Sequence, residues 1–213
     1  THQHVAQLSS ISDGFLVGSS LMAQENLLFA CRSLIVGKTK VCGITRAEDL
    51  VVLADAGADY AGIISVNTSP RFVSQESLKN IVDAASSELP KKALPKLVLV
   101  TRNQKHDEIL SYLNTANFSA IQLHGDEDNQ YIQSLVECLK EHDLDCEVWK
   151  ALGAKAIKQA QNPSGVAGDT STESDSLMDS LCTLDKTLIS KVVIDTVSSN
   201  GQSGGTGEAF NWQ

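Results

Sequence analysis

Lys40-Val-Cys-Gly-Ile-Thr-Arg46 and Val192-Val-Ile-Asp-Thr196 are two short apolar runs, far apart in the chain, that each carry a reactive side chain at the end. These side chains are Cys42 and Asp195. Between them, apolar strand-like runs alternate with amphipathic helical stretches, a pattern typical of parallel β/α proteins. In such folds the chemistry lies at the carboxyl ends of the strands. A thiol and a carboxyl group delivered to that rim would form a base and acid pair across one pocket.

The alternation predicts a regular series of elements that begins at Lys40. Strands are expected near 40–44, 60–65, 96–101, 119–123, 146–151 and 191–195, and helices near 47–56, 74–87, 105–116, 127–141 and 153–160. Gly37-Lys-Thr39 separates this series from an N-terminal segment with the end of a helix at 1–12, a strand at 15–17 and a helix at 21–35.

Two features limit the fold class. Residues 161–185 are polar and small, which favours a mobile surface insertion. Six strands after Gly37 are too few to close a β/α barrel, which needs eight. The sequence therefore predicts an α/β fold of the (β/α)8 TIM-barrel type that is incomplete in this chain. Because the chain starts at Thr1, inside a helical pattern, we expect its N-terminus to be a cut and not a natural start.

Composition restricts the class of partner. The chain has 213 residues, 42% of them hydrophobic, and a net charge of -9, which argues against nucleic acids or anionic membranes as partners. No apolar run approaches the roughly 18 residues of a membrane span. The five cysteines include no C-x-x-C pair and none lies near a pair of histidines, so no metal is expected. Their odd number and the lack of a secretory signal favour reduced thiols in the cytoplasm.

Three residues stand out as candidates for chemistry or charge recognition. Cys42 is followed by glycine at a strand end, where its thiolate would act as a base; the alternative is a buried, inert thiol. Asp195 ends an apolar run, where a carboxylate must be paired or exposed; the alternative is a cap on the next loop. Arg71, in Ser69-Pro-Arg71, offers a planar fork for a carboxylate; the alternative is a surface arginine in a turn.

Further candidates lie beside other strand ends. Gln122 and His124 share one face of a strand and are expected to line the pocket, although a lone histidine in a strand is more often structural. The glycine-rich stretch 201–207, with Gly204 and Gly205, predicts a lid beside the active site; Glu208 excludes a nucleotide P-loop. Gly18-Ser19 is a strand-to-helix turn of the kind that binds phosphate.

Several motifs together resemble the phosphoribosylanthranilate isomerase family. They are Lys40-Val-Cys-Gly-Ile-Thr-Arg46, Ala56-Gly-Ala-Asp59, Thr68-Ser-Pro-Arg-Phe-Val73, Ile121-Gln-Leu-His-Gly125, Val148-Trp-Lys-Ala151 and Ile194-Asp-Thr196 with Gly204-Gly-Thr-Gly207. The match runs in order over 40–212. Gly14-Phe-Leu-Val-Gly-Ser-Ser-Leu-Met22 resembles the last βα unit of indole-3-glycerol-phosphate synthase. We therefore expect a synthase-like tail at 1–36, a linker at 37–39 and an isomerase-like partial barrel at 40–213.

The resemblance implies a role in tryptophan biosynthesis, within a bifunctional isomerase and synthase. The reaction would be the Amadori isomerisation of N-(5-phosphoribosyl)anthranilate to 1-(2-carboxyphenylamino)-1-deoxyribulose 5-phosphate. By similarity, Asp195 is the general acid that opens the ring, Cys42 is the general base and Arg71 holds the anthranilate carboxylate. The resemblance also implies no cofactor and a small phosphorylated substrate.

Alternatives to a working isomerase site remain open at this stage. The macromolecular partner is either a fused domain or a second copy of the chain. Because the last two βα units of the family are missing after Gln213, the chain alone is expected to have little or no isomerase activity. One alternative is a non-catalytic remnant that keeps the motifs. A thiol-based redox protein is a weaker alternative, since no resolving cysteine lies near Cys42.

Overall fold

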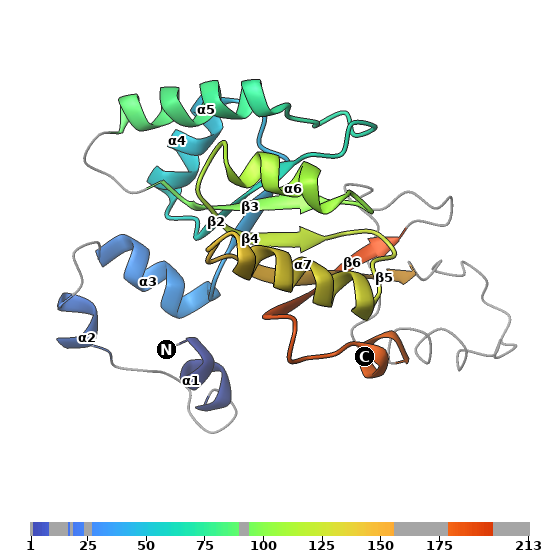
Figure 1. Ribbon diagram of the computed structural model, residues 1–213. Helices are drawn as coiled ribbons and strands as arrows, with labels where there is room; N and C mark the ends of the chain where they lie inside the picture. The colour runs from blue at the N-terminus through green and yellow to red at the C-terminus, as the bar shows by residue number, and fades with distance from the viewer. Residues whose placement is uncertain are drawn as a thin grey trace, which may run out of the picture. The chain divides into compact units, whose positions relative to one another are not determined.

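The structure is a computed structural model that describes residues 2–8, 17, 19–23, 27–89, 94–155 and 179–197. In these ranges the strands are β1 (Lys40–Cys42), β2 (Tyr60–Ile64), β3 (Lys96–Thr101), β4 (Phe118–Leu123), β5 (Glu147–Lys155) and β6 (Lys191–Val197). The helices are α1 (His2–Leu8), α2 (Ser19–Met22), α3 (Leu27–Val36), α4 (Ala47–Ala56), α5 (Gln75–Glu88), α6 (His106–Leu113) and α7 (Asn129–Glu141). Figure 1 shows the alternation of strands and helices.

The six strands form one sheet in the order β1-β2-β3-β4-β5-β6. The pairs β1–β2, β2–β3, β4–β5 and β5–β6 are parallel. Strands in sequential order, with the helices α4, α5, α6 and α7 between successive strands from β1 to β5, are the arrangement of a TIM barrel. The predicted fold class is thereby confirmed, with six of the strands in the described residues.

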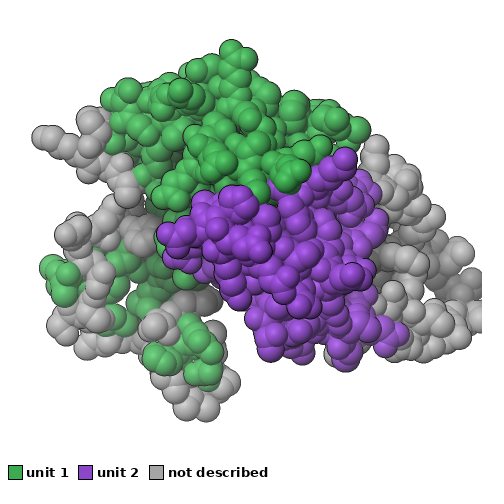
Figure 2. All heavy atoms as spheres, in the orientation of Figure 1, with its two compact units in different colours: residues 1–100, 107–119 green, residues 101–106, 120–213 purple. Residues whose placement is uncertain are grey.

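The chain divides into two compact units, coloured separately in Figure 2. The first contains residues 1–100 and 107–119, and the second contains 101–106 and 120–213. In the first, every residue of β2 is buried, as expected of a parallel strand covered on both faces. The apolar stripe of α5 (Leu78, Ile81 and Ala85) is buried as well, and α5 packs against α4.

The second unit is built on β4, β5 and β6 with helix α7. Ile132, Leu135 and Leu139 form the buried stripe of this helix, and Asp128 caps its N-terminus by accepting a hydrogen bond from the backbone N–H of Tyr131 at 2.8 Å. The neighbouring strand residue Ile121 is fully buried. These side chains belong to the buried apolar core of the second unit.

Local signals explain most of the element boundaries. Helix α4 ends at Gly57, which has a φ of 71° and donates its N–H to the carbonyl of Ala54. Such a left-handed cap strongly favours glycine. Helix α5 begins after Ser74, whose hydroxyl accepts from the backbone N–H of Ser77. The predicted helices at 47–56 and 74–87 are therefore confirmed within about two residues.

One predicted helix is wrong in part. The expectation of a helix at 153–160 fails over 153–155, which continue β5. The reason is tertiary: Gly153 pairs with Asp195, and the next two residues pair with Thr196 and Val197 on β6. Pairing with a neighbouring strand overrides local helix propensity here. Residues 156–160 lie outside the described residues.

The N-terminal predictions meet the structure only in places. Helix α1 falls within the helix expected at 1–12. The helix expected at 21–35 overlaps two helices, α2 and α3, and residues 24–26 between them lie outside the described residues. Most of the strand expected at 15–17 and most of the insertion at 161–185 also lie outside the described residues. The described end of that insertion contains a short helical segment at 179–183.

Candidate active site

Cys42 is the last residue of β1, and its side chain is exposed. It lies beside Gly62 of β2, with which it pairs in register. A Cβ atom at Gly62 would lie 2.8 Å from the Cys42 Sγ and 3.0 Å from the Lys40 Nζ. The thiol and the ammonium group therefore occupy the space that the missing side chain of Gly62 leaves. The expectation of burial in the alternative reading of Cys42 is wrong.

Arg71 lies next to Cys42. Its Nη1 donates to the backbone carbonyl of Cys42 at 3.4 Å, and its side chain crosses Gly43, where a Cβ would lie 2.6 Å from the Arg71 Cδ. The loop that carries Arg71 returns to the sheet, because Val73 donates its N–H to the carbonyl of Ile64 at 2.9 Å. The structure thus brings the predicted base and the predicted carboxylate-binding arginine together.

His124 and Asp195 form the second pair of candidate residues. His124 follows β4 directly, and Asp195 lies on β6. The His124 Nε2 is 3.1 Å from the Asp195 Oδ2, and about a quarter of each side chain is exposed. A carboxyl group in contact with an imidazole at a partly exposed strand end can exchange a proton with it. Asp195 thus has the imidazole of His124 as a specific partner.

Gln122 faces the same side of this sheet as Asp195. It pairs in register with Trp149, and from Trp149 alternate residues of β5 lead to Gly153, the partner of Asp195. The Gln122 side chain is only 3% exposed, and its Oε1 has no hydrogen-bond partner within the described residues. Because an unpaired buried carbonyl is costly, this oxygen is available to a donor on a ligand.

The remaining predicted site residues cannot be placed in a site. Gly18, Gly204 and Gly205 lie outside the described residues. Ser19 is the first residue of α2, and its side chain is likewise outside the description.

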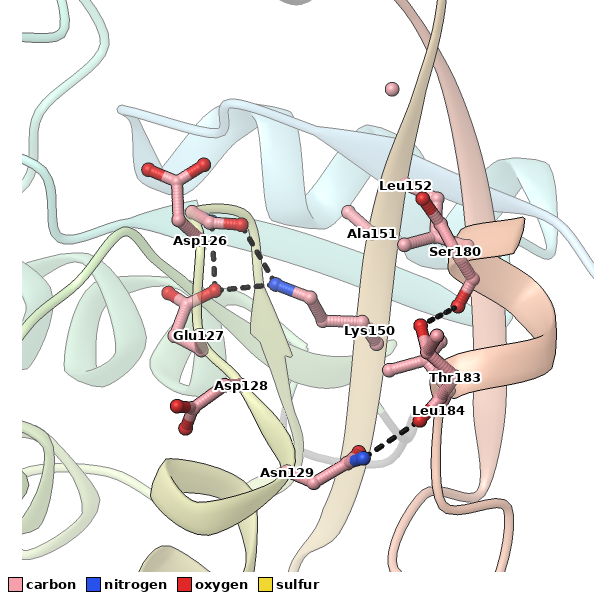
Figure 3. Close-up of a pocket in the computed structure, with 12 residues that line it drawn as sticks. Asp126, Glu127, Asp128, Asn129, Lys150, Ala151, Leu152, Ser180, Thr183 and Leu184 are labelled. Carbon is pink, nitrogen blue, oxygen red and sulfur yellow. Dashed lines mark hydrogen bonds and ion pairs between the residues drawn. The ribbon is translucent and has the colours of Figure 1, made fainter. Parts of the chain in front are cut away.

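The sequence reasoning missed a buried ion pair. Lys150 of β5 and Glu127 of the loop after β4 lie 2.7 Å apart, Nζ to Oε2, with 5% and 0% of their side chains exposed. Both line a hollow of about 400 Å³, which also borders residues 180–184, and Figure 3 shows Lys150 reaching toward Glu127. The signal that could have indicated the pair was a lysine inside the otherwise apolar run at 148–152.

The other thiols differ from Cys42 in their surroundings. Burial, assisted by the charges of Asp145 and Glu147, raises the pKa of the Cys146 thiol to about 12. Such a thiol stays protonated at neutral pH and is a poor base or nucleophile.

No group of three histidine, cysteine or acidic side chains in the described ranges is arranged to hold a metal ion. Among the helices that the structure describes, none has the length and apolar character needed to span a membrane.

The family model for N-(5'-phosphoribosyl)anthranilate (PRA) isomerase matches residues 39–213. The chain belongs to this family. The matched range contains every isomerase motif noted above, from the strand with Cys42 to the glycine-rich stretch. The resemblance found in the sequence is therefore confirmed.

Curated relatives extend the PRA isomerase match to the N-terminal segment. The chain is 33% identical over 211 residues to the tryptophan biosynthesis protein TrpCF of Yersinia pestis, and 34% identical over 212 residues to that of Salmonella typhi. These matches cover 99% and 100% of the chain but only 36% and 38% of the relatives. The chain thus spans little more than a third of their length. Nothing in these comparisons favours a non-catalytic remnant.

A solved PRA isomerase shares the fold. The crystal structure of phosphoribosyl anthranilate isomerase from Thermotoga maritima aligns with a TM-score of 0.57 and 23% identity. The alignment covers 82% of this chain and 68% of that chain. At this identity the likeness supports the TIM-barrel type of fold and nothing further.

Proposed function

We propose that the chain supplies the acid and base groups of an isomerase that converts N-(5-phosphoribosyl)anthranilate to 1-(2-carboxyphenylamino)-1-deoxyribulose 5-phosphate. The observation that carries the proposal is the exposed thiol of Cys42 at the end of β1, with Arg71 donating to the backbone carbonyl of the same residue, in a chain of the PRA isomerase family. An Amadori rearrangement consists of proton transfers at oxygen and carbon, so a positioned acid and a positioned base suffice for the reaction.

The acid step falls to Asp195. Its protonated carboxyl donates a proton to the furanose oxygen, the bond between that oxygen and C1 breaks, and the lone pair of the nitrogen forms the Schiff base. His124, 3.1 Å from the carboxyl, is placed to return a proton to Asp195. Asp195 is thereby restored for the next turnover.

The base step falls to Cys42. Its thiolate removes the proton from C2, and the electrons of the C–H bond neutralise the Schiff base to give an enolamine. The enolamine becomes the ketone when C1 takes a proton and the hydroxyl on C2 loses one. The Lys40 Nζ and the Cys42 Sγ both lie over Gly62. The Arg71 guanidinium binds the anthranilate carboxylate, for which its planar fork is suited.

Other predicted residues complete the proposal. Gln122 accepts a hydrogen bond from the substrate with its Oε1, which has no hydrogen-bond partner among the described residues. Gly204 and Gly205, which lie outside the described residues, are proposed to take part in substrate binding. Gly18 and Ser19 would bind phosphate in the synthase part.

The domain organisation is part of the same proposal. We infer a synthase-like tail at 1–36, a linker at 37–39 and an isomerase-like partial barrel at 40–213. Support comes from the family model, which begins at residue 39, and from TrpCF relatives that match the whole chain. We therefore propose a bifunctional isomerase and synthase of tryptophan biosynthesis in the cytoplasm, with the synthase as fused partner domain and a second copy of the chain as the remaining alternative.

The test is an isomerase assay on the protein as its gene encodes it, with the product identified by mass spectrometry. The unmodified protein is expected to form the 1-deoxyribulose phosphate. Arg71→Met is expected to raise KM at least about tenfold, because it removes a charged hydrogen-bonding partner of the carboxylate. Arg102→Met, at an exposed arginine, is the control. Absence of product from the folded, unmodified protein would refute the proposal.

A further inference from the structure

The loop after β4, residues 124–128, is held by a buried ion pair to which the proposed chemistry assigns no role. Lys150 reaches from β5 to Glu127, and almost nothing of either side chain meets solvent. Burying a charge is costly unless it is paired and fully hydrogen-bonded. The contacts of this pair therefore indicate what it stabilises.

Those contacts converge on the backbone around Gly125. The Lys150 Nζ donates to the carbonyl of Gly125 at 2.7 Å, and the N–H of Gly125 donates to the Glu127 Oε2 at 2.9 Å. The N–H of Asp126 donates to the Asn103 Oδ1 at 2.8 Å, and the N–H of Asn103 donates to the Glu127 Oε1 at 2.8 Å. Side chains thus hold the peptide groups on both sides of Gly125.

Packing at Gly125 removes the remaining freedom. A Cβ there would lie 2.2 Å from the Asn103 Oδ1 and 2.9 Å from the Glu127 Oε1, so the loop is in close contact with its supports. On the other side of His124, its own N–H donates to the carbonyl of Thr101 at 2.9 Å. The backbone of His124 is therefore fixed before and after the residue, which leaves the side chain to be set by its torsion angles.

Lys150 also connects this loop to the strand that positions Asp195. It lies on β5, three residues before Gly153, which pairs in register with Asp195 on β6. The 3.1 Å contact between His124 and Asp195 thus joins two segments that Lys150 holds together. We propose that Lys150 and Glu127, together with Asn103, are positioning residues that hold His124 against Asp195. The expected effect of these residues on isomerase turnover rests on the proposed function, whereas their effect on the position of His124 does not.

The competing explanation is that the ion pair supports folding alone. The test compares Lys150→Met and Asn103→Gly with the unmodified 213-residue chain, and Lys140→Met, at an exposed lysine of α7, is the matched control. Asn103→Gly tolerates the φ of 51° at this position and keeps the ion pair, but it removes the amide that supports Asp126. The readouts are circular dichroism for folding and the ring ¹⁵N signals of His124, assigned by their loss in His124→Asn.

The proposal expects both variants to change the His124 ring signals while Lys140→Met leaves them unchanged. In the isomerase assay on the protein as its gene encodes it, kcat should fall about 10- to 100-fold with KM altered less than about threefold. Lys150→Arg, which keeps a buried cation, should restore part of kcat.

Unchanged His124 signals in a folded Lys150→Met variant would overturn the proposal. Should Lys150→Met not fold, unchanged His124 signals in Asn103→Gly would overturn the proposal instead. The NMR measurement needs no substrate, so it tests the positioning of His124 even if the unmodified protein has no isomerase activity. Lack of isomerase activity in the unmodified protein would refute only the proposed function.

Discussion

Replacing Gly125 with alanine tests how tightly the loop after β4 is packed. The new Cβ would lie 2.2 Å from the Asn103 Oδ1, whereas carbon and oxygen atoms normally approach no closer than about 3.3 Å. The Asn103 side chain must therefore withdraw by about 1 Å, which breaks its 2.8 Å hydrogen bond from the N–H of Asp126. Overpacking and the lost bond together are expected to lower the free energy of unfolding by about 2 kcal/mol.

A double-mutant cycle in urea denaturation identifies the cause. In an Asn103→Gly background the 2.2 Å contact is absent, and the nearest remaining atom is the Glu127 Oε1 at 2.9 Å. Gly125→Ala should then cost less than about 1 kcal/mol, which leaves a coupling of about 1 kcal/mol between the two positions. Equal costs in both backgrounds, with unchanged m-values, would refute the reasoning.

Three further predictions concern the site and its supports. Gly62→Ala would place a Cβ 2.8 Å from the Cys42 Sγ. The value of kcat/KM in the isomerase assay should therefore fall about 100-fold while the protein stays folded. Unchanged turnover would count against this placement of the thiol. Because the pKa of Cys146 is raised to about 12, this thiol should react with iodoacetamide far more slowly at pH 8 than the exposed Cys182. The rate of alkylation of Cys146 should still rise with pH above 10. Equal rates for the two cysteines at pH 8, measured by peptide mass spectrometry, would contradict this prediction. Asp128→Ala should lower the free energy of unfolding by about 1 kcal/mol because the α7 cap is lost, whereas Asp128→Asn should retain most of the stabilisation by the cap. Equal urea midpoints for the unmodified protein and both variants would argue against the cap.

Local sequence signals were sufficient for much of the fold. The apolar run at 96–101 and the cap at Gly57 are properties of neighbouring residues, and the structure has the strand and the helix end where the sequence predicts them. The continuation of β5 through 153–155 depends instead on pairing with β6. No pattern within those three residues distinguishes a strand from the start of a helix, so this boundary could not be predicted locally.

The candidate site shows the same division. The sequence indicated Cys42, Arg71 and His124 as polar residues near strand ends. Their contacts, such as the one between His124 and Asp195, depend on which strands lie side by side. The Lys150–Glu127 pair was missed for that reason: a lysine in an apolar run looks like an exception until the loop that receives it is known.

The most direct test of the central claim is the turnover number of single substitutions at the proposed base and acid. Cys42→Ser and Asp195→Asn are each expected to lower kcat in the isomerase assay by about 10²- to 10⁴-fold while the protein stays folded. The matched changes Cys182→Ser and Asp185→Asn, at exposed positions, should leave kcat within about twofold. Near-normal turnover by either the Cys42 or the Asp195 variant would contradict the account.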